Sequence, residues 1–88
     1  MRIPTIVLYT KPSCCLCKTA KFLIERTLLS IDAFAVKPQI HEIDISKSNH
    51  LEEEYGHVLP VIEIDGEVVS ELKIDMPAIR KALLNITS

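Results

Sequence analysis

The sequence predicts an α/β fold in which three helices flank a four-stranded mixed sheet. The hydrophobic pattern changes along the 88 residues in the order β-α-β-α-β-β-α. A strand–helix–strand unit gives a parallel pair of strands, whereas two strands joined by a tight turn are antiparallel. With right-handed crossovers, this order leaves one mixed sheet with helices on both faces. We expect a single domain over residues 1–88, because a chain of this length builds one core.

The first half of the chain predicts two strands and the helix between them. Residues 5–9 are almost uniformly apolar and β-prone, which is typical of a strand buried on both faces. From Lys18 to about Leu29, apolar residues recur at helical spacing and the charges lie mostly elsewhere on the wheel. We expect the connection 30–38 to pack on the surface or to lengthen this helix. A second, less buried strand is predicted at 39–45, since acidic residues interrupt its isoleucines.

A short second helix is predicted next. Ser48 and Asn49 resemble a helix start, and Asn49 with Glu52 has the spacing of a capping box. The helix should run to Tyr55 and end at Gly56.

A hairpin and a third helix complete the chain. Strands at 58–64 and 67–69 are joined by Asp65-Gly66, the strongest short-range hairpin signal in the sequence. Asp75 is placed to cap the last helix, which has a proline in its first turn. Four apolar residues give that helix one core-facing side: Ile79, Ala82, Leu83 and Ile86.

Three cysteines lie within four residues, between the first strand and the first helix. Cys14 and Cys17 form a C-x-x-C pair, one helical turn apart and on nearly the same face, whereas Cys15 diverges from both. Unpaired backbone N–H groups and the positive dipole end of a helix favour a thiolate at this position, and Lys11 adds a nearby cation. We therefore expect thiol chemistry at Cys14 and Cys17, with Cys15 as a spectator or a secondary oxidation site.

Composition and charge narrow the functional class. A net charge of −2 without a basic stripe argues against nucleic acid or an anionic membrane as partner. The first apolar run is too short for a signal peptide, and no run is long enough to span a bilayer. Cysteines clustered this locally cannot link distant elements, so a cycling dithiol in the reducing cytoplasm is expected.

Two sequence motifs resemble those of glutaredoxins. Tyr9-Thr10-Lys11-Pro12-Ser13-Cys14-Cys15-Leu16-Cys17 is similar to their Y-[ST]-K-P-x-C-x-x-C opening, and Val58-Leu59-Pro60-Val61 is similar to their second signature. The resemblance covers the whole chain and implies the thioredoxin fold. The residues after Cys14 look more like the divergent small glutaredoxin-like proteins. The resemblance to glutaredoxins also implies that the Leu59-Pro60 peptide bond is cis and that the backbone there faces the reactive sulfur.

The resemblance implies a thiol–disulfide oxidoreductase that takes electrons from a thiol donor. Cys14 would attack a disulfide-containing protein or a glutathione mixed disulfide, and Cys17 or an external thiol would resolve the intermediate. Lys11, Leu59 and Pro60 are the candidate contacts to substrate or glutathione. No cofactor or resident metal is expected, with glutathione as a possible co-substrate, although Val69-Ser70-Glu71 stands where glutaredoxins usually have a Gly-Gly turn and an acidic residue that hold it.

A second function remains open from the sequence. Soft thiolates also bind zinc, copper(I) or an iron–sulfur cluster, so the same cysteines could serve a metal or cluster carrier. For the oxidoreductase, we expect a monomer.

Overall fold

Four strands and three helices make up the part of the chain that the computed structural model describes, residues 3–31 and 38–87. The order confirms the predicted β-α-β-α-β-β-α sequence of elements, with one 3-10 turn added after the second strand. The elements are β1 (Ile6–Thr10), α1 (Cys15–Ser30), β2 (Ile40–Asp44), the turn η1 (Ile45–Lys47), α2 (Asn49–Tyr55), β3 (Val61–Ile64), β4 (Glu67–Ser70) and α3 (Met76–Thr87).

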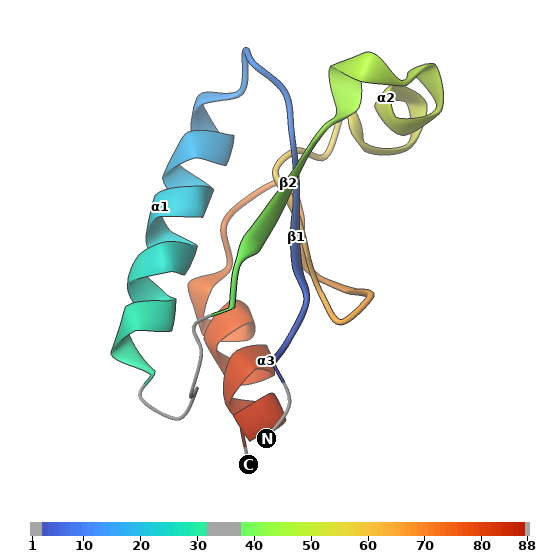
Figure 1. Cartoon of the computed structure of the whole chain (residues 1–88). Helices are drawn as coiled ribbons and strands as arrows, with labels where there is room; N and C mark the ends of the chain where they lie inside the picture. The colour runs from blue at the N-terminus through green and yellow to red at the C-terminus, as the bar shows by residue number, and fades with distance from the viewer. Residues whose placement is uncertain (1–2, 32–37, 88) are drawn as a thin grey trace.

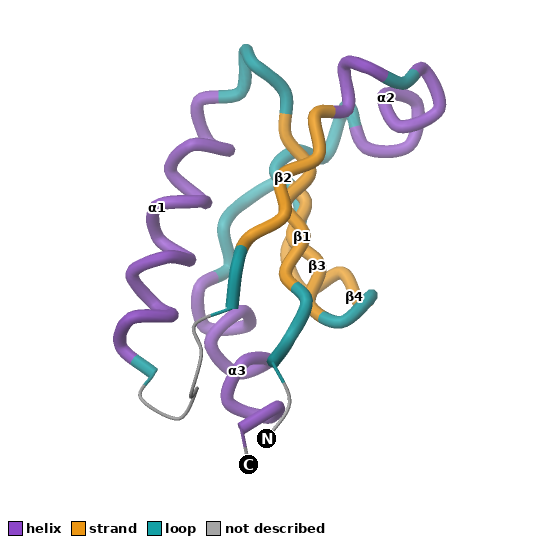
Figure 2. The backbone as a smooth tube through the Cα atoms, viewed as in Figure 1, coloured by secondary structure: helices purple, strands orange, loops and turns teal. Residues whose placement is uncertain are grey.

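The strands form one mixed sheet in the order β2-β1-β3-β4 (Figures 1 and 2). β1 lies parallel to β2 and antiparallel to β3, and β3 lies antiparallel to β4. Because β1 and β2 are parallel, their carboxyl ends meet at the same end of the sheet. Figure 2 shows the loop between β1 and α1 and the start of α2 at this end. Any chemistry carried by that loop is therefore located here.

The main core lies between the sheet and the helices α1 and α3. Figure 1 shows both helices on the same side of the strands. Apolar side chains from β1, β3, α1 and α3 meet there, because every second strand residue and every third or fourth helix residue faces the same layer. The buried members of this cluster are Ile6, Leu8, Ala20, Ile24, Leu28, Ile31, Ile62, Ile64, Ile79 and Leu83.

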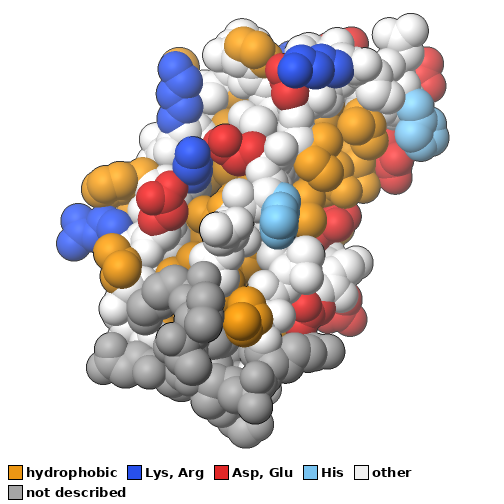
Figure 3. All heavy atoms as spheres, viewed as in Figure 1, with side chains coloured by type: hydrophobic (Ala, Val, Ile, Leu, Met, Phe, Trp, Pro, Cys, Tyr) orange, Lys and Arg blue, Asp and Glu red, His pale blue; other side chains and the backbone are white. Residues whose placement is uncertain are grey.

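The opposite face of the sheet is only partly covered, so the prediction that β1 is buried on both faces is wrong. Ile6 and Leu8 are fully buried, but Val7 and Tyr9 are only half-buried. The cause is the shortness of α2, whose seven residues pack beside one end of the sheet (Figure 1). Figure 3 shows a group of apolar side chains at the surface on this side.

The β3–β4 hairpin turns at Asp65-Gly66, as predicted. Both residues have positive φ, 53° and 86°, which is the geometry of the two-residue turn that matches strand twist. Asp65 also joins the start of the chain: its N–H donates to the Thr5 carbonyl at 2.8 Å, and its Oδ1 accepts from the Thr5 N–H at 2.9 Å. β3 begins at Val61, three residues later than predicted, because the preceding proline has no N–H to donate to a strand ladder.

The helix caps agree in part with the predictions. Asp75 caps α3 through its Oδ1, which accepts from the Ala78 N–H at 3.1 Å. α2 is capped by the Ser48 hydroxyl instead of Asn49; it accepts from the Leu51 N–H at 3.4 Å, so the predicted capping box does not form. α1 ends at Ser30, and most of the connection predicted to pack or to extend it lies outside the described residues. No helix in the described ranges is both long and apolar enough to cross a membrane.

Candidate functional site

Cys14 is the N-cap residue of α1. A turn closes the loop between β1 and the helix, with the Cys14 N–H donating to the Lys11 carbonyl at 3.0 Å. The Cys14 backbone is extended, and its Sγ accepts a hydrogen bond from the Cys17 N–H at 3.3 Å. α1 thus begins at Cys15, three residues before the predicted start at Lys18. The Cys14 sulfur occupies the position where a helix offers unpaired N–H groups and its positive dipole end.

The sulfurs of Cys14 and Cys17 lie at disulfide-bonding distance, and their Cα atoms are 5.4 Å apart. Their exposures differ: Cys17 is only 2% exposed, whereas Cys14 is half-buried. Cys15 is exposed and carries a free thiol. The structure therefore joins the two cysteines predicted to pair and leaves the third outside. A reagent from solvent can reach Cys14, while Cys17 is reached through Cys14.

The Cys17 sulfur faces the end of β1 as well as Cys14. It lies 4.0 Å from the carbonyl oxygen of Tyr9. In the reduced protein this oxygen can accept the Cys17 S–H as a weak hydrogen bond.

Lys11 lies beside a shallow pocket of mixed charge next to the cysteine loop. The pocket has a volume of about 370 Å³ and is lined by Thr10, Lys11, Pro12, Lys18, Glu42 and Asp44. The Ser46 hydroxyl and N–H both donate to the Asp44 carboxylate, and these bonds hold its pKa below the usual value. The pocket thus combines two lysines with two carboxylates, of which Glu42 pairs with Lys21 at 3.4 Å.

The predicted cis peptide bond is confirmed at Leu59-Pro60. Pro60 is buried and Leu59 is half-buried. Because Tyr9 is opposite Val61 in the β1–β3 ladder, Pro60 is adjacent to the end of β1, from which the cysteine loop leaves. The structure thus places the Leu59-Pro60 segment and the cysteine loop at the same end of the sheet. Leu59 and Lys11 remain predicted substrate contacts.

A pair of tyrosines beside this end was not predicted. The rings of Tyr9 and Tyr55 stack with centroids 4.2 Å apart and planes 21° from parallel. Burial raises the pKa of Tyr9, and a hydrogen bond with Tyr55 and the nearby Glu63 carboxylate raise it further. The stack fixes α2 against β1. No local pattern indicates it, since the two tyrosines are 46 positions apart and meet only in the folded chain.

The three cysteines do not form a metal cluster with other side chains of the described region. Within residues 3–31 and 38–87, no group of three or more His, Cys, Asp or Glu side chains is arranged to hold a metal ion. His41, His50 and His57 are all exposed.

Comparisons with known proteins agree with this geometry. Residues 5–85 match the glutaredoxin-like domain family (DUF836). No curated protein matches the chain.

Solved structures with the same fold cover almost the whole chain. A Nitrosomonas europaea protein solved by NMR has a TM-score of 0.77 at 17% identity, covering 93% of both chains. A thioredoxin-like protein has a TM-score of 0.62 at 26% identity, covering 93% of this chain and 96% of its own. Buckwheat glutaredoxin, solved with glutathione, has a TM-score of 0.61 at 16% identity, covering 96% of this chain and 76% of its own.

These likenesses establish the thioredoxin fold, and the family match covers both the cysteine loop and the Leu59-Pro60 segment. A Cys14–Cys17 pair at bonding distance on this fold fits a redox function. The chain belongs to the glutaredoxin-like domain family.

Proposed function

We propose that the protein is a thiol–disulfide oxidoreductase with Cys14 as nucleophile and Cys17 as resolving thiol. The observation that carries this proposal is the unequal exposure of two sulfurs at bonding distance. Cys14 is accessible at the helix cap, and Cys17 is 2% exposed behind it. An exposed sulfur suits attack on an external disulfide, and a buried neighbour suits an internal attack on the product.

The reaction transfers two electrons from the dithiol to the substrate. The Cys14 thiolate attacks one substrate sulfur, so that the substrate S–S bond breaks, a mixed disulfide forms, and the other substrate sulfur leaves as a thiolate. The Cys17 thiolate then attacks Cys14 Sγ, forming the Cys14–Cys17 disulfide and releasing the second substrate thiolate. An external thiol donor reduces the enzyme disulfide and completes the cycle.

The Leu59-Pro60 segment supports a proposed mode of substrate binding. The Val58 carbonyl accepts from the Leu72 N–H at 2.7 Å, and Pro60 has no N–H to offer. The backbone of Leu59 is then left to pair with an extended substrate in the manner of an added strand. Lys11 would attract a substrate carboxylate from the other side of the cysteine loop.

The partners that we propose are a disulfide-containing protein or a glutathione mixed disulfide, together with a thiol donor. The protein would act as a monomer in the cytoplasm, where reducing conditions allow the pair to cycle. Glutathione is a proposed co-substrate, and a protein dithiol is the other candidate donor.

The deciding experiment measures turnover of a mixed disulfide with either glutathione and its reductase or a thioredoxin reductase system. Wild type should turn over with one of them, Cys14→Ser should be inactive, and the matched variant Cys15→Ser should retain activity. If the wild-type protein reduces no disulfide with either donor system, the proposal is contradicted. A coloured preparation that loses its visible absorbance on chelation would instead support the carrier function.

A further inference from the structure

Leu72 combines two features that do not favour folding. Its φ is +68°, in the left-handed region that a leucine rarely adopts. Its side chain is 60% exposed, although leucine is among the residues most often buried. A strained backbone with an exposed apolar side chain does not serve core packing, so this conformation points to a functional role at the surface.

Hydrogen bonds on several sides hold this conformation in place. The Lys73 N–H donates to the Glu71 carbonyl at 2.7 Å, which closes a three-residue turn around Leu72. A turn of this kind with positive φ at its centre is rare and strained. The Leu72 N–H donates to the Val58 carbonyl at 2.7 Å. The backbone bonds thus fix Leu72 against the segment that leads to Leu59-Pro60.

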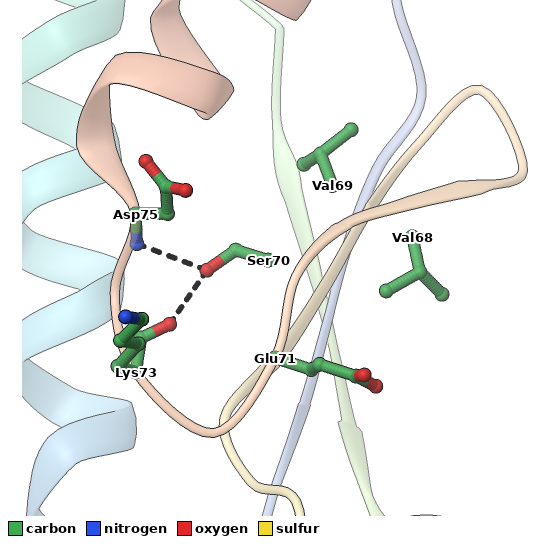
Figure 4. A pocket seen from close by; sticks show the side chains of 6 residues that line it. All are labelled: Val68, Val69, Ser70, Glu71, Lys73 and Asp75. Atoms are coloured by element: carbon green, nitrogen blue, oxygen red, sulfur yellow. Dashed lines mark hydrogen bonds between the residues drawn. The ribbon is translucent and has the colours of Figure 1, made fainter.

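A buried serine fixes the other end of the turn. Ser70 is only 5% exposed, and its hydroxyl donates to the Lys73 carbonyl at 2.7 Å and accepts from the Asp75 N–H at 3.0 Å. Figure 4 shows the hydroxyl between these two groups, at the junction of β4 and α3. The strained turn is therefore determined by its surroundings, as is typical of strain at functional positions.

The position of Leu72 follows from the strand order. Tyr9 is opposite Val61, and Ile62 is opposite Ser70, so the chain leaves β4 at the end of the sheet that carries the cysteine loop. β1 and β4 are two strand spacings apart, on the order of 10 Å. An extended substrate rises about 3.3 Å per residue, so its side chain two or three positions from the reacting cysteine can span this distance.

We infer that Leu72 is a specificity-determining residue that contacts an apolar substrate side chain two or three residues from the reacting cysteine. This inference rests on the proposed oxidoreductase function and deepens it by naming the substrate class. The favoured substrate is a protein disulfide flanked by apolar residues. The Leu72 side chain is exposed, and the Leu72 N–H binds the carbonyl of Val58, the residue before Leu59, so an apolar substrate residue can cover Leu72 there.

The test compares two peptide disulfides that differ only in leucine or aspartate two positions from the reacting cysteine. The rate of oxidation of the reduced protein gives a leucine-to-aspartate preference. Covering about half of a leucine side chain corresponds to roughly tenfold, so wild type should prefer the leucine peptide by about that factor. Leu72→Asn, which tolerates positive φ, should reduce the preference to within twofold. Leu72→Gly should do the same and raise the melting temperature by about 5 °C, since the strain is relieved.

The matched control is Leu29→Asn, which changes another exposed leucine near the far end of α1. This variant should keep the wild-type preference. A preference that survives in Leu72→Asn, or one that Leu29→Asn also loses, overturns the inference. If wild type oxidises equally fast with both peptides, the oxidoreductase function stands and the role of Leu72 is refuted. If it reacts with neither peptide nor a small-molecule disulfide, the proposed function itself fails.

Discussion

Replacing Ser70 with alanine should destabilise the fold by about 2 kcal/mol. The hydroxyl makes two hydrogen bonds to backbone groups, to the Lys73 carbonyl and from the Asp75 N–H, and it is 5% exposed. A typical net contribution is about 1 kcal/mol for each bond, and a partner left without water costs more. For a domain of this size, the loss corresponds to a fall in melting temperature of roughly 8–16 °C.

The assay is urea unfolding of the reduced protein, so that the disulfide does not contribute. Ser30→Ala is a matched control, because the Ser30 hydroxyl also donates to one group, the Thr27 carbonyl, and accepts from another, Arg80 Nη1, but at the exposed end of α1. We expect it to cost less than about 0.5 kcal/mol. Equal costs for the two variants would refute the argument that burial makes the Ser70 bonds important.

The remaining predictions concern the cysteines, Tyr9 and the hairpin. Cys14→Ser should abolish disulfide reduction, Cys17→Ser should accumulate a mixed disulfide visible by mass spectrometry, and Cys15→Ser should leave the linked pair unchanged; a pair involving Cys15 would contradict this division. The pKa of Tyr9 is 10.0 in the unfolded chain and higher in the folded protein. Above pH 10 the unfolded chain therefore loses this proton while the folded protein keeps it, so the free energy of unfolding should fall as the pH rises. The fall should be smaller in Tyr9→Phe; parallel curves for the two proteins would exclude the effect. Gly66→Ala should lower the free energy of unfolding by about 1 kcal/mol in thermal unfolding, because alanine is strained at a φ of +86°; a clash is not the cause, since no atom lies within 4 Å of the added Cβ. Gly66→Asn should cost less, because asparagine tolerates positive φ, and equal losses would point to packing instead of backbone conformation.

Elements defined by local patterns were predicted well. The order of strands and helices, the Asp65-Gly66 turn and the Asp75 cap each depend on residues close in sequence, and the structure confirms them. The Cys14–Cys17 pair follows from helical spacing in the same way. The start of α1 was placed at Lys18 because the charged and apolar pattern begins there, although the cysteines form the first turn.

Features that depend on distant parts of the chain were missed. The uncovered face of β1 results from the length of α2, which the pattern of β1 itself cannot reveal. The stack of Tyr9 on Tyr55 needs the packing of α2 against the sheet. The sequence does not indicate the positive φ of Leu72, because this conformation is usually found at glycine or asparagine and not at leucine. That conformation is held by the hydrogen bond that the Leu72 N–H donates to the Val58 carbonyl and by the one that the Ser70 hydroxyl donates to the Lys73 carbonyl.

The exclusion of Cys15 from the disulfide makes the number of titratable thiols a direct readout of oxidation state. The oxidised chain has one free thiol, at Cys15, whereas the fully reduced chain has three, of which Cys17 is buried in the folded protein. A thiol-counting reagent added under denaturing conditions, where Cys17 is also accessible, can therefore follow the conversion in bulk without separating the two forms. The same arrangement allows a fluorescent label to be attached at Cys15 while the other two sulfurs are protected by their own bond, so that a probe sits one residue from the reacting centre. Reduction after labelling would then give a dithiol protein whose optical signal reports the arrival and departure of its partners.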